Sequence, residues 1–339
     1  MAGKITLSTI ADDLRVSTAT VSLALRDSPL VAENTKKLVR ARAKEIGYVY
    51  DRRAASLRTQ RSDIVGVIVR DIINPFFAEI LRSIEAELGS NRQTFLLCNH
   101  GDDIELQNEF ISTLMQFGAD GVIMSPSVGT TTEEIRRIEN NGLPVTLVAR
   151  TVEDAGAPAF LGDDVAGFKL VTHHLLVQGH RDIALIGGTR LTSTGRARRE
   201  GFAEAFKEMG VDLPNRPDIE TPYERTAGFN AVGEILKQGP PPTAIACCSD
   251  TVAIGVMHGL RQNGLEPGQD VAVTGYDDIE ESAISAPPLT TVNDGHGEIG
   301  RLAARALQAK IRNETTDEGD VLIAPTLQVR QSVNRLNKS

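Results

Sequence analysis

The sequence is poor in the features of membrane-spanning and disulfide-stabilised proteins. No apolar run approaches the roughly 20 residues that a membrane-spanning helix requires. The N-terminus begins Met1-Ala-Gly-Lys and passes directly into an amphipathic pattern, without the apolar stretch of a secretory signal. Three cysteines in 339 residues exclude a disulfide framework, and the adjacent Cys247 and Cys248 are predicted to be small core residues. We therefore expect a cytoplasmic protein with no membrane partner.

Motifs for metal binding and catalysis are also missing. The six histidines are scattered, with neither an HExxH motif nor a Cys/His cluster, so no metal site is predicted. Gly187-Gly188 follows a predicted strand, but the phosphate-binding pattern GxxxxGK[ST] is absent. No arrangement of nucleophile and base is evident. We therefore expect a protein that is not an enzyme and needs no cofactor, with an enzyme kept as an alternative.

Charge is distributed unevenly along the chain. Residues 1–61 hold 12 Lys and Arg against 6 Asp and Glu, whereas the remainder holds 24 against 39. A small basic head with a net charge of +6 thus precedes a large acidic body with a net charge of −15. This asymmetry predicts a polyanion-binding module attached to a body that does not touch the polyanion.

The first fifty residues have the periodicity of three short helices. Apolar residues of the first fall at i, i+3, i+4 and i+7, namely Leu7, Ile10, Ala11 and Leu14. Ser17 is a good N-cap for a second helix that continues to about Arg26. A third is predicted from about Glu33 to Gly47, with Leu38, Val39 and Ile46 buried. Two helices joined by a short break and followed by a third indicate a helix-turn-helix, with an ordinary helical bundle as the alternative.

A basic segment, Asp51–Arg61, follows this head. It carries four arginines and one acid, and Leu57 is its only large apolar residue. A solvated linker is the simpler interpretation of such a run. However, a flexible linker has no need of an isolated leucine flanked by arginines, and Ala54-Ala55 with Ser56 and Leu57 suits a short helical core.

From Ile64 onward, short apolar runs alternate with amphipathic helices. This alternation predicts parallel sheets of doubly wound α/β type, and about 270 residues suit two lobes better than one. Strands are predicted at 64–69, 94–98, 121–124, 145–148, 183–186, 244–248, 271–274 and 321–323. The predicted division is a head at 1–50, a hinge at 51–62, an N-terminal lobe at 63–161 with 292–320, a C-terminal lobe at 162–291 with 321–332, and a short tail at 333–339.

Polar side chains follow many of these predicted strands. Ligands of open α/β sheets bind beyond the carboxyl ends of the strands. Two lobes that face each other across such loops would form a cleft for a small polar or polyhydroxylated molecule. A sugar-binding protein without a DNA-binding role fits the body alone, but the basic head argues against it.

Short motifs occur in a fixed order along the whole chain: Ile5-Thr-Leu7, Ile46-Gly47-Tyr48, Asn74-Pro75-Phe76-Phe77, Gly179-His180, Gly275-Tyr276-Asp277-Asp278 and Pro288-Leu289-Thr290-Thr291-Val292. Together they resemble the lactose/galactose repressor (LacI) family of bacterial transcription regulators. The resemblance implies a helix-turn-helix head on a core of periplasmic-binding-protein type. It also implies a homodimeric repressor that binds a near-palindromic operator DNA under the control of a small-molecule effector.

The resemblance implies that Ser17–Leu25 is the recognition helix. The DNA-binding residues implied are Ser17, Thr18, Ala19, Thr20, Ser22, Leu23, Thr35, Ala54, Leu57 and Arg58. Thr18, Ala19 and Leu23 match base-reading positions, yet they supply one hydroxyl and otherwise methyl groups, which cannot form bidentate hydrogen bonds to guanine or adenine. Leu57 matches a wedge that enters the minor groove. We therefore expect DNA shape and the hinge to supply an unusual share of the specificity.

Hydroxyl and basic side chains of the head are expected to contact phosphates, which fix register without carrying sequence information. The hydroxyl residues are Ser17, Thr20, Ser22 and Thr35. Lys4, Arg26, Lys36, Lys37 and Arg40 either join these contacts or form a solvated face.

In the body, the resemblance implies effector contacts at Asn74, Phe76, Phe77, Ser125, Arg150, Arg198, Ser249 and Asp277, with Arg196, Phe160 and His100 as further candidates. Arg198 and Asp277 suit a ring of hydroxyls, since a guanidinium donates and a carboxylate accepts several hydrogen bonds. Asp250 is expected to cap the helix from Thr251. A carbohydrate that releases DNA is the expected effector, and a purine-type corepressor is the alternative. The tail after Arg330 is too short for a heptad helix, so we expect a dimer without a tail-built tetramer.

Overall fold

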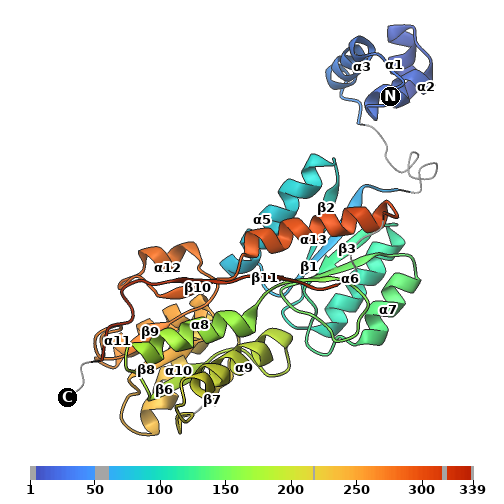
Figure 1. Cartoon of the computed structure of the whole chain (residues 1–339). Helices are drawn as coiled ribbons and strands as arrows, with labels where there is room; N and C mark the ends of the chain where they lie inside the picture. The colour runs from blue at the N-terminus through green and yellow to red at the C-terminus, as the bar shows by residue number, and fades with distance from the viewer. Residues whose placement is uncertain (1–4, 50–60, 217, 315–318, 337–339) are drawn as a thin grey trace. The chain divides into compact units, whose positions relative to one another are not determined.

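The computed structural model describes residues 5–49, 61–216, 218–314 and 319–336 (Figure 1). The chain divides into two compact units, Met1–Ser62 and Asp63–Ser339. The three hinge residues predicted to bind DNA, Ala54, Leu57 and Arg58, lie outside the described ranges.

The head contains the three predicted helices, α1 (Leu7–Leu14), α2 (Thr18–Leu25) and α3 (Glu33–Glu45). They pack around a small core whose fully buried members are Ile10, Val21, Ala24 and Val39. The prediction that Leu38 is buried is wrong, because its exposed fraction is 60%. The buried face of α3 runs instead through Lys36, Val39 and Ala43, and a residue next to Val39 on a helix points about 100° away from it.

The N-terminal lobe is built on a six-stranded sheet in which every pair of neighbours is parallel. In spatial order its strands are β11 (Val321–Ile323), β5 (Ala159–Gly162), β4 (Val145–Val148), β3 (Gly121–Met124), β1 (Ile64–Val69) and β2 (Thr94–Asn99). Helices α5 (Pro75–Ser90) and α13 (His296–Ile311) cover one face, and α6 (Ile104–Gln116) and α7 (Thr132–Asn140) cover the other.

The C-terminal lobe has a four-stranded parallel sheet. Its strands in spatial order are β7 (Asp218–Ile219), β6 (Ile183–Ile186), β8 (Ala244–Cys247) and β9 (Ala272–Thr274). Helices α8 (Asp164–Val177) and α9 (Ser193–Glu208) lie on one face, α10 (Arg225–Lys237) and α11 (Asp250–Gln262) lie on the other, and the short α12 (Glu280–Ile284) follows β9. The predicted doubly wound α/β fold is confirmed for both lobes.

The chain passes between the lobes at three places. It leaves the N-terminal lobe after β5, returns after β10 (Thr291–Asn293), and leaves again between β11 and β12 (Thr326–Gln328), which pairs antiparallel with β10. The assignment of residues 321–323 to the C-terminal lobe is wrong, because β11 pairs with β5 in register Val321 to Phe160. This short apolar run completes the edge of the first sheet before the chain crosses.

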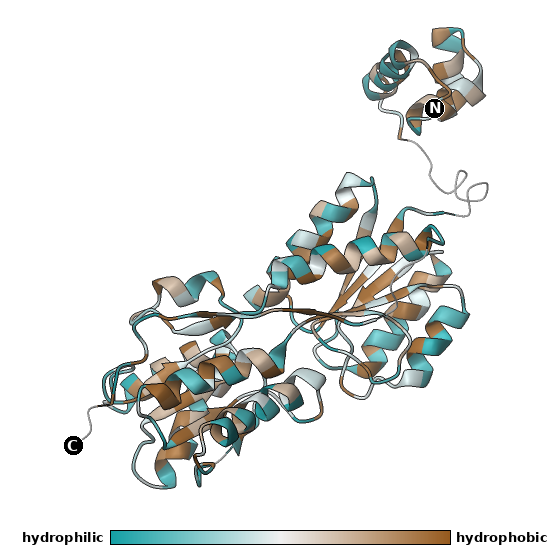
Figure 2. Ribbon diagram, in the orientation of Figure 1, coloured by the Kyte–Doolittle hydropathy of each residue, from teal (hydrophilic) through white to brown (hydrophobic). Residues whose placement is uncertain are grey.

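Hydrophobic residues lie along the strands and on the inner faces of the helices, and hydrophilic residues lie on the outer faces (Figure 2). Cys98, Cys247 and Cys248 are free and buried, as predicted for the adjacent pair. Among the described residues, no helix is both long and apolar enough to cross a membrane.

Candidate functional site

A cleft between the two lobes is lined by charged and aromatic side chains. The N-terminal lobe contributes Arg70, Asn74, Phe76, Phe77, Ala149, Arg150 and Gly162 to its lining, and Asp164, Thr194, Arg198, Tyr223, Asp277 and Asp294 complete it. Six of the eight predicted effector residues are therefore brought together here: Asn74, Phe76, Phe77, Arg150, Arg198 and Asp277.

Arg198, on α9, is the central cation of the cleft and is 5% exposed. Its Nε donates to Asp164 Oδ1 at 2.8 Å, and its Nη1 donates to the carbonyl oxygen of Cys248. Its Cζ lies 4.0 Å from the centroid of the Tyr276 ring, within the range of a cation–π contact. These contacts come from three different elements, so they hold the guanidinium in one orientation.

Asp277 lies beside this guanidinium, with its Oδ1 3.6 Å from Arg198 Nη2. Its backbone φ of 109° is in a region that aspartate rarely occupies, a kind of strain that clusters at ligand sites. Burial raises the pKa of Asp277, an effect that Arg198 opposes and the nearby Asp294 reinforces. Burial likewise raises the pKa of Asp164, against the charge of Arg198. One guanidinium thus serves two buried carboxyl groups, which leaves oxygen atoms able to bind ligand hydroxyls.

An aromatic wall faces these charges from the N-terminal lobe. Asn74 is the N-cap of α5, and its Oδ1 accepts a hydrogen bond of 3.1 Å from the amide of Phe76. Pro75 at the first helical position fixes the turn that follows. The rings of Phe76 and Phe77 meet edge to face, with centroids 5.1 Å apart. Tyr223 adds an aromatic ring from the C-terminal lobe.

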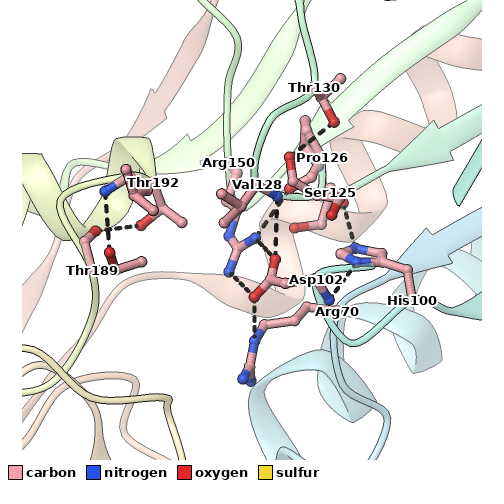
Figure 3. Close-up of polar contacts among 12 residues, drawn as sticks. Arg70, His100, Asp102, Ser125, Pro126, Val128, Thr130, Arg150, Thr189 and Thr192 are labelled. Carbon is pink, nitrogen blue, oxygen red and sulfur yellow. Dashed lines mark hydrogen bonds and ion pairs between the residues drawn. The ribbon is translucent and has the colours of Figure 1, made fainter. Parts of the chain in front are cut away.

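Arg150 follows β4 and forms a two-pronged ion pair with Asp102 (Figure 3). The same carboxylate accepts a hydrogen bond of 2.8 Å from Arg70 Nε. Burial alone would raise the pKa of Asp102, but the hydrogen bonds and charges of Arg150 and Arg70 outweigh it and lower the pKa to about 2. Asp102 is therefore ionised at neutral pH.

Two predicted effector residues do not line the cleft. Ser125 is fully buried, and its carbonyl oxygen accepts a hydrogen bond of 3.0 Å from His100 Nε2. Ser249 is the N-cap of α11, with its Oγ accepting from the amide of Val252 at 3.2 Å. Of the further candidates, Phe160 belongs to the core, and Arg196 donates to the backbone carbonyl of Arg190.

The prediction that Asp250 caps α11 is wrong, because Ser249 occupies the cap. The Asp250 carboxylate is fully buried and accepts hydrogen bonds from the Ile279 amide and from the hydroxyls of Ser282 and Thr291. It therefore ties α11 to the loop after β9 and to the crossing strand β10. A serine one position earlier meets the geometry of an N-cap equally well, so sequence alone does not separate the two.

Five charged or aromatic residues of the site were not predicted from the sequence: Arg70, Asp102, Asp164, Tyr223 and Asp294. Arg70 carried a usable signal, since it is the first residue beyond the carboxyl end of β1. Asp164 and Asp294 lie just beyond two of the crossings between the lobes, which became clear only from the strand pairing.

On the head, the N-terminal turn of α2 presents Ser17, Thr18 and Ala19 as exposed residues. Thr20, Leu23 and Thr35 are half-buried. Ser17 caps the helix, with its Oγ accepting from the Thr20 amide at 3.0 Å. Ser22 is only 4% exposed, so the structure gives no support to its predicted phosphate contact.

Two of the basic residues considered for phosphate contacts are engaged within the head. Lys36 is 5% exposed and pairs with Glu33 at 2.7 Å and with Asp27 at 3.4 Å. Arg40 also pairs with Asp27, although its side chain is 43% exposed.

Comparison with known proteins decides the family. Residues 62–332 match the profile described as periplasmic binding proteins and sugar binding domain of LacI family, and residues 6–51 match that of bacterial regulatory proteins, lacI family. The chain belongs to the LacI family. The family, fold class and general function predicted from the sequence are thereby confirmed: this LacI-family chain is a DNA-binding transcriptional repressor controlled by a small molecule.

Among curated relatives, the ribose operon repressor of Escherichia coli (strain K12) is 30% identical over 96% of this chain and 99% of its own length. The repressor PurR of Actinobacillus pleuropneumoniae serotype 3 (strain JL03) is 30% identical over 98% of this chain and 99% of its own. Both relatives are named as repressors, and both align over nearly their whole length, so the likeness extends over the head and the core together.

Two solved structures of the LacI family match the fold. The lac repressor dimer bound to operator covers 98% of this chain and 100% of its own, with a TM-score of 0.85 and 23% identity. A LacI family regulator from Enterococcus faecium with bound ribose covers 81% of this chain and 100% of its own, with a TM-score of 0.73 and 27% identity. The first likeness shows the fold, and the second matches the two-lobed core.

Proposed function

We propose that this chain is a homodimeric repressor whose binding to a near-palindromic operator is switched by a carbohydrate held in the cleft between the lobes. The observation that carries the proposal is the buried pair of Arg198 and Asp277 facing the aromatic wall of Phe76. Guanidinium donors and carboxylate acceptors suit a ring of hydroxyls, and aromatic faces suit the apolar surface of a sugar ring. Relatives named ribose operon repressor and the ribose-bound structure from Enterococcus faecium support the same ligand class.

A purine-type corepressor is the second candidate, because relatives named PurR are as similar to this chain as the ribose repressors are. The cleft favours the carbohydrate. Asp164 and Asp277 pair with the central guanidinium of Arg198, and Asp294 adds a third carboxyl group to the cleft, which gives an acceptor-rich surface for hydroxyl donors.

The same geometry gives the ligand a means of acting on the DNA. Gly162 ends β5 at one crossing between the lobes, and Asp294 follows β10 at another. A ligand that touches both crossings binds one lobe arrangement better than the other, and a difference in affinity is what shifts such an equilibrium. We infer that the bound carbohydrate releases the operator.

On the DNA side, Thr18 and Ala19 are the exposed residues at the start of the recognition helix, and Leu23 is half-buried behind them. This surface reads thymine methyl groups and DNA shape rather than base-edge hydrogen bonds. Two-fold symmetry of the dimer matches the two halves of the operator. Leu57 in the hinge acts as the minor-groove wedge.

The proposal is tested by calorimetric titration and thermal-shift screening of the full chain against pentoses, hexoses, hypoxanthine and guanine. A carbohydrate that binds, raises the unfolding temperature of the core and weakens operator binding supports it. Binding of a purine with stronger operator binding would favour the second candidate. Binding of a sugar without any salt-sensitive DNA binding would reduce the protein to a sugar-binding module.

A further inference from the structure

Arg70 is a cation at the cleft whose hydrogen-bond donors are not all satisfied within the protein. It stands at the carboxyl end of β1 and is 8% exposed. It lines both the interlobe cleft and a neighbouring opening toward Glu224. Its Nε donates to Asp102, but its Nη1 is buried and has no hydrogen-bond partner. A buried donor without an acceptor is costly, so such an atom in a ligand cleft points to an acceptor supplied by the ligand.

Asp102 cannot supply that acceptor, because both of its oxygens are engaged. Oδ1 accepts from Arg150 Nη1 and, at 3.4 Å, from the amide of Val128. Oδ2 accepts from Arg70 Nε and, at 3.3 Å, from Arg150 Nη2. Figure 3 shows the two arginines approaching this carboxylate from different sides. One negative charge is therefore shared by two guanidinium groups.

Two other carboxylates lie near the forked end of Arg70, and neither forms a hydrogen bond with it. Asp71 Oδ2 is 3.7 Å from Nη1, while Asp71 Oδ1 accepts from the amide of Ile73 at 3.0 Å. Glu224 Oε1 is 3.8 Å from Nη2, and the Glu224 side chain is 53% exposed. These separations exceed the 2.7–3.2 Å typical of N–H···O bonds. The fork of Arg70 thus keeps hydrogen-bonding capacity despite its neighbours.

The charges that line the cleft are also divided between its two sides. Arg70 and Arg150 come from the N-terminal lobe, whereas Asp164 and Asp277 come from the C-terminal lobe around Arg198. A neutral sugar satisfies the second group through its hydroxyls but supplies no negative charge to the Nη1 donor of Arg70, which has no hydrogen-bond partner. A ligand with hydroxyls at one end and a negative group at the other satisfies both.

We propose that the effector is an anionic carbohydrate, and that Arg70, reinforced by the charge of Arg150, receives its carboxylate or phosphate group. A guanidinium fork matches both anions in a two-pronged geometry. The hydroxyls lie toward Arg198 and Asp277, on the side of the cleft opposite Arg70. This inference rests on the proposed function, since it names the ligand class of the same cleft.

The test is calorimetric titration of the full chain with two matched series of compounds. One consists of D-ribose, D-ribonate and D-ribose 5-phosphate, and the other of D-glucose, D-gluconate and D-glucose 6-phosphate, with inorganic phosphate alone as a reference. We expect at least one anionic member to bind at least tenfold more tightly than its neutral parent. Tighter binding of the acid or of the phosphate ester identifies which anion the site takes.

The variant Arg70→Gln should lose about tenfold to hundredfold in affinity for the anionic member, the range for a charge-assisted hydrogen bond, and keep neutral-sugar affinity within about threefold. Arg70→Lys should recover part of the loss, because it restores the charge without the fork. Arg150 still pairs with Asp102 in these variants, so the core should fold, and its unfolding temperature verifies this.

Glu224→Gln is the matched control for the alternative that Arg70 acts only through its attraction to Glu224 on the other lobe. If Arg70 acted only by attracting Glu224, both variants would shift the affinities of neutral and anionic sugars in parallel, which would overturn the inference. In our proposal, Glu224→Gln keeps or strengthens anion binding, since it removes a competing carboxylate. Equal binding of neutral and anionic sugars by the native protein also overturns the inference but leaves the proposed function standing. If no compound of either series binds, the proposed function itself fails.

Discussion

The guanidinium of Arg198 lies over the ring of Tyr276, with Cζ 4.0 Å from the ring centroid. Tyr276 is fully buried and stacks on Phe168 of α8, with ring centroids 6.0 Å apart. The cation of the cleft is thereby supported by the hydrophobic core of the C-terminal lobe. Its orientation is set by packing before any ligand arrives, which reduces the ordering cost of binding.

Replacement of Arg198 by lysine should abolish the effector response while operator binding persists. Lysine keeps the charge, but a single ammonium cannot bond to Asp164 and the Cys248 carbonyl while lying over Tyr276. We expect more than a tenfold loss of effector affinity by calorimetry. Arg190→Lys is the control, because Arg190 pairs with Asp218 and Glu220 on the surface and its side chain is 55% exposed. Equal losses in both variants would contradict a specific role for Arg198.

The close packing of α10 against α11 depends on glycines. A Cβ built on Gly255 would lie 2.0 Å from the carbonyl oxygen of Arg225, and backbone cannot move aside as a flexible side chain can. Gly255→Ala should lower the free energy of unfolding by about 1–3 kcal/mol, as overpacking does. Gly233→Ala on α10 has no neighbour within 4 Å and should raise it by about 0.5–1 kcal/mol. Urea unfolding measures both, and a destabilised Gly233→Ala would refute the packing argument.

The two lobes were predictable because their strands are short and almost wholly apolar. β1 and β3 have the predicted bounds, and each is followed by an amphipathic helix. β5 (Ala159–Gly162) was missed because it is short and follows a run of small residues and a proline, Pro158. β11 was found as a strand but placed in the wrong lobe, since strand pairing is a long-range property that periodicity does not encode.

The residues of the candidate site that match family motifs were predicted from the sequence. Those that come together only in the fold were not. Arg198 and Asp277 were predicted as effector contacts from the resemblance to the family. Asp102 is 48 residues from Arg150 and 32 from Arg70, and nothing local in the sequence indicates that the three share one ion-pair cluster. Charges of this kind become interpretable only when the sheet brings the strand ends together.

Asp250 should make the stability of the core depend on pH. Burial raises its pKa to about 7, against the hydrogen bonds from Ser282, Thr291 and the Ile279 amide. Between the ordinary value of 3.8 and about 7, the folded state binds a proton that the unfolded state releases. This contribution to stability is therefore fully present below about pH 4 and is lost as the pH rises through 7.

Unfolding temperatures of the native protein and of Asp250→Asn at pH 5, 6, 7 and 8 test this prediction. The advantage of the native protein should shrink toward pH 8, by at most about 1.4 kcal/mol per pH unit. Asparagine does not titrate, so parallel curves for the two proteins would show that Asp250 is not the responsible group.

In the DNA-binding head and hinge, Leu57→Ala should remove specific operator binding and leave the salt-dependent background, because the wedge is lost while the phosphate contacts remain. Leu30→Ala is a matched control in the head, where Leu30 is 83% exposed and has no assigned role. Mobility-shift assays over a range of salt concentrations separate specific operator binding from the salt-dependent background. Unchanged operator affinity in Leu57→Ala would remove the wedge from the mechanism.

Leu23→Ala tests how much of the sequence specificity comes from the recognition helix α2. Leu23 packs against the core of the head, so the stability of this variant must be measured alongside its binding. We expect it to retain a clear preference for the operator over unrelated DNA. A collapse of half-site preference in a folded head would instead make α2 the main reader.

The central claim is that a carbohydrate in the cleft controls the DNA. Fluorescence anisotropy of the full chain on a labelled near-palindromic site, with and without a saturating carbohydrate shown by calorimetry to bind, tests it most directly. The account predicts that the ligand raises the operator Kd of the native protein by about 5- to 150-fold, the usual range of allosteric coupling, and leaves that of Arg198→Lys unchanged. An operator Kd that does not change while the cleft is saturated, or that falls, would contradict it.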